Sequence, residues 1–193
     1  NIGLDKIGAG VGKYMSWGYL PHEDKYQHPT IEGRNAAMIM KSGVYDSTTD
    51  IHQLMEHTFT RENTSHAWYN EGDENIHPFD RNTAPIRNND LDFDGAYSWS
   101  TAVSHKDLGR MEVGALAREL IAGGDHGESW QHKDGLVLDM FKKMGGPSVH
   151  LRVFARMHEL TKLYRQTEHC LREFNLRDPW YIKPQEKDGR GWG

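Results

Sequence analysis

The most regular hydrophobic pattern in the chain lies near its C-terminal end and is helical. Ser148 is a natural N-cap, and the helix that it starts should end before Asp178-Pro179, because the position before a proline disfavours helix. We expect a helix of about 42 Å over residues 148–175, with Lys162 on its outer face. One stripe at three- and four-residue intervals comprises Val149, Val153, Met157, Leu160, Tyr164, Thr167, Leu171 and Phe174, widened by Phe154, Leu163 and Cys170. Its buried members should include Val153, Met157, Leu160 and Tyr164.

Three shorter segments also have helical patterns. Gly114 can cap a helix that Gly123-Gly124 stops, and residues 133–144 place four apolar side chains on one side. Residues 47–59, "STTDIHQLMEHTF", open with hydroxyl and aspartate side chains that can cap a helix. Their apolar positions then fall on one helical face, so a helix is predicted there as well.

The remaining segments favour strands and loops. Residues 13–21 alternate aromatic with small or polar side chains, and residues 37–46 are apolar enough for a strand or two. Residues 61–100 are polar and interrupted by prolines, but "DFDGAYSW" has too many aromatic side chains for a disordered linker. The predicted fold class is mainly α with some β (α+β), in a single portion covering residues 1–193. It divides into loops and short strands over 1–46, a short helix and long ordered loops over 47–110, core helices over 111–178, and a closing loop over 179–193.

Composition places the chain among globular proteins and narrows its partners. Its 193 residues contain 36% hydrophobic side chains and carry a net charge of −5, without a long basic run. This balance argues against a nucleic-acid partner. The longest wholly apolar run, Ala36–Met40, is too short to span a bilayer. The single cysteine cannot form an internal disulfide.

Two short motifs resemble binding signatures but fail where the ligand would be contacted. "IGAGVGK" (residues 7–13) lacks the third glycine of a dinucleotide loop, and it lacks the first glycine of a nucleotide P-loop. "HELTK" (residues 158–162) has Lys162 where a zinc-protease helix needs its second histidine. We interpret the first as a flexible glycine loop and the second as a pair on a helix surface.

Twelve histidines raise the question of a metal site. They show no close pairing along the chain, so hydrogen-bonded loop anchors are the favoured interpretation, and a site assembled in space stays open. Cys170 lies within the apolar stripe, where a small buried hydrophobe is expected. The histidines outside "HELTK" include His22, His28, His52, His57, His66, His77, His105, His126 and His132.

Arg152 and Arg156 are less easily explained. Like charges four residues apart destabilise an isolated helix by a few tenths of a kcal/mol. The pair therefore indicates carboxylate or carbonyl partners from elsewhere in the fold. A solvated helix face is the alternative.

Four sequence segments occur in the same order as similar segments of one protein family. They are "TRENTSHAWY" (60–69) followed by "IHPFDRNTAPI" (76–86), then "DFDGAYSWSTAV" (92–103), "MEVGALAR" (111–118) and "SVHLRVFARMHE" (148–159). Together they resemble passages of the large, active-site subunit of nickel–iron hydrogenases, such as MEVGPLAR and STLGRTAARALE. Ala115 stands in place of the proline, Leu151 replaces a glycine, and a Pro-Arg-Tyr ending is missing. The amino-acid sequence of these segments is most similar to that of actinobacterial-type uptake enzymes.

The resemblance implies a function for the whole protein. Such an enzyme oxidises dihydrogen at a nickel–iron centre held by two C-x-x-C pairs, and it passes electrons to a small subunit with iron–sulfur clusters. This chain has neither pair, so it resembles the middle of the subunit, and we assign it no catalytic or metal-binding residue. The candidate structural or interface residues are Arg118, Arg152, Arg156 and Glu159. The resemblance further implies contact with the rest of the large subunit, a higher oligomer, and a cytoplasmic or peripherally membrane-associated location.

Two alternatives come from other functional classes. One is a structural or assembly module of the same fold without chemistry. The other is a metalloenzyme, complete in itself, that uses His, Asp and Glu ligands.

Overall fold

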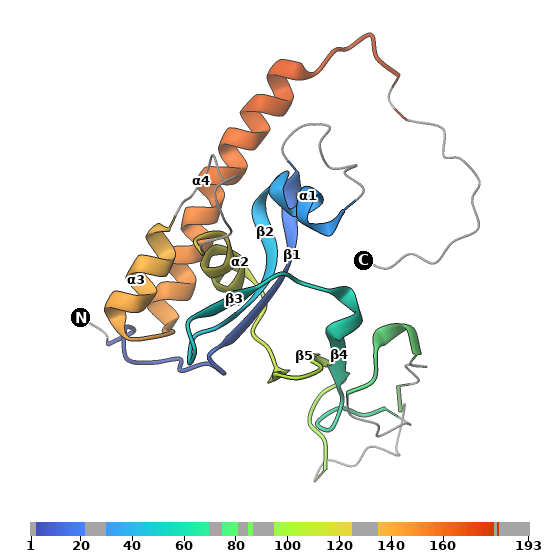
Figure 1. The fold of residues 1–193 in the computed structure, drawn as a ribbon, viewed down its shortest axis with the longest axis vertical. Coiled ribbons are helices and arrows are strands. Elements are labelled where there is room, and N and C mark those ends of the chain that lie inside the picture. Colours follow the sequence, from blue (N-terminus) through green and yellow to red (C-terminus); the bar gives the residue numbers. More distant parts are fainter. Residues whose placement is uncertain are drawn as a thin grey trace.

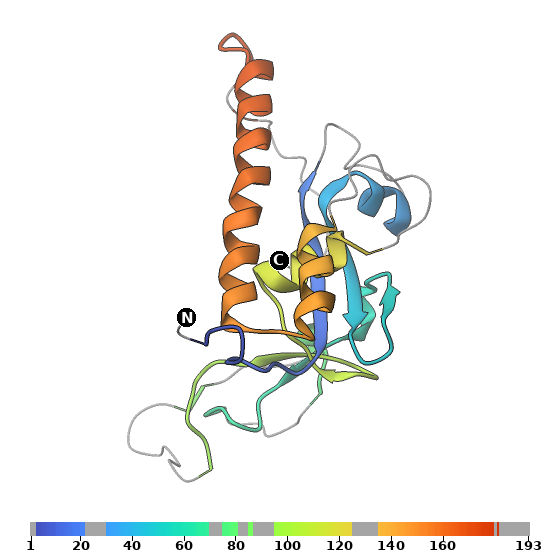
Figure 2. The ribbon, with the colours of Figure 1, turned by 90° about the vertical axis from the view of Figure 1, so that its left-hand side faces the viewer.

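A computed structural model describes residues 3–21, 30–69, 75–80, 85–86, 95–124, 135–179 and 181. These residues form four α-helices and two three-stranded antiparallel sheets, which is the mixed α+β class that the sequence predicts (Figure 1). The helices of the C-terminal half of the chain lie on one side of the first sheet, the short helix of residues 31–36 lies apart from them, and the second sheet lies at the other end of the molecule (Figures 1 and 2).

The first sheet has the order β1-β2-β3. Its long strands are β1 (Lys13–Pro21) and β2 (Met38–Asp46), and β3 (Ile51–Gln53) pairs with the end of β2. A short helix that the sequence patterns did not indicate, α1 (Ile31–Ala36), precedes β2 and is capped by the Thr30 side chain, which accepts from the Gly33 N–H.

The second sheet is smaller and has the order β4-β5-β6. Its strands are β4 (Thr60–Asn63), β5 (Ala102–His105) and β6 (Gly109–Arg110). Two 3₁₀ turns, η2 (His57–Phe59) and η3 (Pro78–Asp80), lie beside it in the sequence.

The hydrophobic core lies between the first sheet and the helices. Helix α2 (Ala115–Ala122) packs against β1, β2 and the two later helices, α3 (Leu136–Met144) and α4 (Val149–Glu173). Seven of the eight α2 residues are buried, so the helix contributes packing on almost every side. Tyr14 of β1 and Tyr45 of β2 stack at 5.9 Å between ring centroids, and Phe141 of α3 meets Tyr14 edge-on at 5.7 Å. The sheet and helices are thus joined by an aromatic cluster.

The predicted caps and stops of the helices are present. Gly114 caps α2 and Gly123 ends it, while the Ser148 hydroxyl accepts a hydrogen bond of 3.1 Å from the Leu151 N–H at the start of α4. Helix α3 spans residues 136–144 of the predicted 133–144, and residues 133 and 134 lie outside the described residues.

The helix predicted over residues 47–59 is wrong. Residues 51–53 form β3, and residues 57–59 form η2. The Asp46 carboxylate accepts hydrogen bonds from the Thr48 N–H (2.9 Å) and hydroxyl (2.6 Å), and Asp50 has a left-handed backbone with φ of 54°. The polar residues that could have capped a helix therefore close a turn between β2 and β3.

The predicted buried face of α4 is also wrong. Its buried residues are Leu151, Ala155 and Glu159. The small Ala155 side chain and ion pairs beside it let α4 lie against α2, so contact depends on a face that the apolar stripe does not mark. The residues predicted to be buried have relative exposures of 52% (Val153), 59% (Met157), 51% (Leu160) and 71% (Tyr164). Figure 2 shows the C-terminal half of α4 extending past α2 and α3.

Candidate functional site

The four sequence segments that point to a family come together in two clusters. In the first, the Trp68 N–H donates to the Ser98 carbonyl and the Ile86 N–H donates to the Trp68 carbonyl, both at 2.9 Å. The rings of Trp68 and Trp99 lie 4.3 Å apart. Segments 60–69, 76–86 and 92–103 therefore meet around Trp68, although parts of the last two lie outside the described residues.

The second cluster joins the segments "MEVGALAR" and "SVHLRVFARMHE" through two Arg–carboxylate pairs. Arg118 of α2 donates from Nε and Nη2 to the two carboxylate oxygens of Glu159 on α4, the second contact being 2.8 Å. Arg152 of α4 binds Glu112 in the same two-point manner, at 2.7 and 2.8 Å. Such parallel contacts fix direction as well as distance. They hold α4 at a defined angle against α2 and the segment before it.

The glycine loop at residues 7–13 lies against the Arg152–Glu112 pair. Arg152 Nη1 donates to the Gly8 carbonyl at 2.5 Å. A Cβ atom on Gly8 would lie 2.9 Å from Arg152 Nη1, and one on Gly10 would lie 2.6 Å from a Glu112 oxygen. Gly8 and Gly10 therefore let the backbone approach an ion pair closely, and Gly12 adopts a left-handed φ of 74°, so the glycines of "IGAGVGK" have structural reasons that involve no phosphate.

Tyr14 lies buried beside the same ion pair. Burial and the neighbouring Glu112 carboxylate raise the pKa of its hydroxyl, so it stays protonated. Its oxygen has no hydrogen-bond partner among the described residues. Tyr14 therefore contributes mainly its ring to the core.

A third charged group lies in the α2–α4 contact and was missed at the sequence level. Glu119 of α2 is fully buried, and its Oε2 accepts from Lys162 Nζ at 2.6 Å and lies 3.2 Å from His158 Nδ1. Burial raises the pKa of the Glu119 carboxyl, and the Lys162 ammonium opposes that shift. The other oxygen, Oε1, has no hydrogen-bond partner within the described part of the chain.

This arrangement corrects the expected position of Lys162. Its side chain is only 10% exposed and faces α2, not solvent. The "HELTK" motif thus supplies His158 and Lys162, one turn apart, to a single buried glutamate. The sequence did contain one sign of this buried charge, because Glu119 interrupts the apolar run of "ALARELIA".

Of the four candidate residues, the structure pairs three and leaves one exposed. Arg118 with Glu159, and Arg152 with Glu112, form the ion pairs described above. Arg156 is exposed, and no hydrogen bond or ion pair joins it to another described residue. The two arginines one turn apart therefore have different surroundings.

The donor groups in this part of the chain do not fit a nickel–iron centre. Among the described residues, no three His, Cys, Asp or Glu side chains are grouped so that they could hold a metal ion. Cys170 is exposed on α4, which corrects its predicted burial. Because such a centre needs several soft thiolates, one exposed cysteine cannot supply it.

The described histidines occupy separate places. Two act as the predicted loop anchors, because His77 Nδ1 accepts from the Phe79 N–H at 3.1 Å and His105 Nδ1 accepts from the Asp107 N–H at 3.2 Å. His52 stacks on Tyr45 at 4.3 Å between ring centroids. Four others, His22, His28, His126 and His132, lie outside the described residues.

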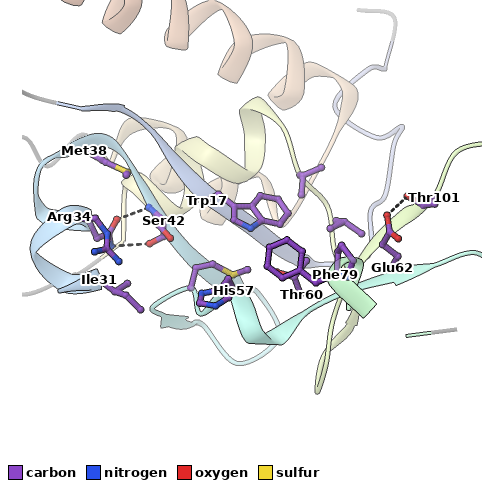
Figure 3. A pocket seen from close by; sticks show the side chains of 15 residues that line it. Trp17, Ile31, Arg34, Met38, Ser42, His57, Thr60, Glu62, Phe79 and Thr101 are labelled. Carbon is purple, nitrogen blue, oxygen red and sulfur yellow. Dashed lines mark hydrogen bonds between the residues drawn. The ribbon is translucent and has the colours of Figure 1, made fainter. Parts of the chain in front are cut away.

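A pocket of about 900 Å³ lies between α1, the first sheet and the second sheet (Figure 3). Its walls are largely apolar and include Trp17, Met38 and Phe79. Two of its polar contacts are made within the walls: the Asn35 amide exchanges hydrogen bonds with the Ser42 backbone, and Glu62 accepts from the Thr101 hydroxyl at 3.2 Å. The lining thus combines a mainly apolar surface with the charged side chains of Arg34 and Glu62.

Comparison with known proteins identifies the family. The family model for nickel-dependent hydrogenase matches residues 3–177. No curated protein sequence matches the chain. No helix in the described part of the chain is both long and apolar enough to cross a membrane.

Solved structures share the fold. The Ni-Fe-Se hydrogenase from Desulfomicrobium baculatum matches with a TM-score of 0.62 and 23% identity, over 93% of this chain and 35% of that one. The Ni-Fe-Se hydrogenase from Desulfovibrio vulgaris Hildenborough matches with a TM-score of 0.65 and 19% identity, over 94% and 36%. The chain thus spans about a third of the length of these relatives. From the family match over most of its residues, the chain belongs to the nickel-dependent hydrogenase family, and it shares the fold of about a third of these hydrogenase chains.

Proposed function

We propose that this chain is the central part of the large subunit of a nickel–iron uptake hydrogenase, which oxidises dihydrogen to protons and electrons. The family match over residues 3–177 carries this proposal. It is supported by a fold that covers 93% of this chain but only 35% of a hydrogenase chain. The metal ligands would then come from the uncovered remainder, because the donors described here do not fit the centre.

The role of this segment is to support and orient the rest of the subunit. The two Arg–carboxylate pairs and the buried Glu119 fix α4 against α2 and against the N-terminal glycine loop. The partly buried Arg118 and Arg152 and the buried Glu159 hold α4 in place, and the exposed Arg156 is available for contact with another part of the assembly. The partners proposed are the rest of the large subunit and a small subunit whose iron–sulfur clusters receive the electrons, within a higher oligomer.

Purification of the native complex through a tag on the polypeptide that contains this chain tests the proposal. We expect nickel and iron to co-purify with an iron–sulfur protein, and we expect the complex to reduce a dye acceptor when supplied with dihydrogen. A complex that assembles without nickel and does not consume dihydrogen would support the structural-module alternative. Stoichiometric nickel held by residues 1–193 alone after dialysis against a chelator would instead support a self-contained metalloenzyme.

A further inference from the structure

The outward side of α4 has a regular apolar pattern that nothing in the described fold covers. We name it the outer stripe, and it comprises Val153, Met157, Leu160, Tyr164, Leu171 and Phe174. All six side chains are more than half exposed, with relative exposures from 51% to 71%. At about 100° per residue, the stripe lies roughly 150° around the helix from the buried residues that face α2. A monomer rarely presents a continuous apolar surface of this kind to water.

The spacing of the outer stripe is that of a helix-to-helix contact. With Thr167 included, the intervals from Val153 to Phe174 alternate between four and three residues throughout. A strict seven-residue repeat keeps one seam facing a partner helix that crosses at about 20°. The partner surface should therefore be another long helix with its own apolar seam.

The far end of α4 also lacks support within the described fold. Nearly every residue from Tyr164 to Glu173 is exposed, and Figures 1 and 2 both show this part extending past α2 and α3. Helices of a few turns are marginal in water when nothing packs against them. A partner along the outer stripe would supply the missing packing.

Arg156 lies at the edge of the outer stripe, immediately before Met157. It is exposed and is not paired with any described residue, whereas Arg152 one turn earlier is held by Glu112. In a paired helix, the position before an apolar seam residue faces the flank of the partner helix, where opposite charges meet. The partner should therefore carry an Asp or Glu opposite Arg156.

We propose that the outer stripe is the docking surface for a long helix from the part of the large subunit that this chain does not cover, and that Arg156 pairs with a carboxylate on that helix. This inference rests on the proposed function. The occupant follows from length, because chains with this fold are almost three times as long as the region matched here. A second long helix from the same subunit needs no additional protein to cover six exposed apolar side chains.

Photo-cross-linking in the purified complex tests the occupant. With Tyr164 replaced by p-benzoylphenylalanine, irradiation should give cross-links within the large subunit, to a helical segment outside residues 1–193. The same probe at Arg165, which is exposed on another side of α4, should give few or none. Cross-links from position 164 to the small subunit or to a second copy of the large subunit would overturn the proposal, as would the absence of any cross-link.

A matched pair of arginine variants provides a second measurement. Arg156→Ala should lower the melting temperature of the complex by about one to three degrees, whereas Arg165→Ala should change it by less than about half a degree. Equal small effects would contradict the proposed ion pair. If the complex oxidises dihydrogen but position 164 cross-links to another chain, only the proposed docking surface is contradicted. If position 164 cross-links within the large subunit but the complex contains no nickel, only the proposed function is contradicted.

Discussion

At the scale of single residues, charges inside the fold have more influence than charges on its surface. Glu119 is fully buried, and it is tolerated because Lys162 neutralises it at 2.6 Å. A buried pair of this kind contributes little relative to an apolar pair, but losing one partner leaves a charge stranded in the core. The two side chains should therefore be sensitive to separate replacement and tolerant of joint replacement.

Replacing Lys162 tests this interpretation. Lys162→Met should reduce the free energy of unfolding by about 3 kcal/mol, because it removes the ammonium that neutralises the buried Glu119 carboxylate and leaves only His158 beside it. The double variant Glu119→Leu with Lys162→Met should recover most of the loss. Chemical denaturation of the purified complex measures both, with Lys143→Met as the control at an exposed position on α3. A single variant as stable as the control would contradict the buried pairing.

Lys41 offers a pH test in the first sheet. It is buried, and Nζ donates to the Asn35 and Ala36 carbonyls at 2.9 and 2.8 Å, yet burial lowers its pKa from 10.5 to about 8. Between pH 8 and pH 10.5, Lys41 stays protonated in the unfolded chain but loses its proton in the folded chain. The free energy of unfolding should therefore rise with pH from about 8. Above pH 10, Tyr14 and Tyr45 act in the opposite direction, because their folded pKa values are raised.

The measurement is therefore confined to pH 8 to 10. The free energy of unfolding of the unaltered complex should increase across this range by about 1–3 kcal/mol relative to Lys41→Met. Parallel curves for the two proteins would show that the ammonium is not destabilised by burial.

At the scale of elements, the N-terminal loop and α4 form one unit. The backbone of Gly8 and Gly10 follows the Arg152–Glu112 pair so closely that neither position has room for a Cβ. This contact spans most of the chain, since Gly8 and Arg152 are 144 residues apart. Its geometry could not be read from "IGAGVGK", because the sequence alone does not show what the glycines approach.

Gly10→Ala should disturb this unit. A new Cβ would lie 2.6 Å from Glu112 Oε2 and 2.7 Å from Arg152 Nη2, so the ion pair must shift, at a cost of about 1–2 kcal/mol. Gly135→Ser is the control, because its nearest neighbour would be 3.7 Å away and serine suits the N-cap position that Gly135 occupies in α3. Thermal unfolding of the two variants should separate them, and an equal response would mean that the loop accommodates a side chain.

At the scale of the whole molecule, local signals predicted more than distant ones did. The caps at Gly114 and Ser148 depend on neighbouring residues alone, and they were predicted correctly together with the α+β class. The helix prediction for residues 47–59 was wrong because Asp46 and Asp50 form a turn that depends on pairing between β2 and β3.

The prediction of which face of α4 is buried was wrong for another reason. Periodicity locates an apolar stripe but does not say which neighbour covers it. In this portion of the fold, α2 contacts α4 through Ala155 and charged residues. Likewise, no local signal assigns Lys162 to Glu119, because the two side chains meet only once α2 and α4 have packed.

The central claim is that the assembly containing this chain splits dihydrogen, and isotope exchange tests it without a chosen electron acceptor. The purified complex is held under D₂ in ordinary water, and the gas phase is followed by mass spectrometry. Heterolytic cleavage at the complex should release HD, because one deuteron exchanges with solvent protons before the gas re-forms. The same complex produced without nickel in the growth medium should release no HD. An intact complex with stoichiometric nickel that forms no HD would contradict the account.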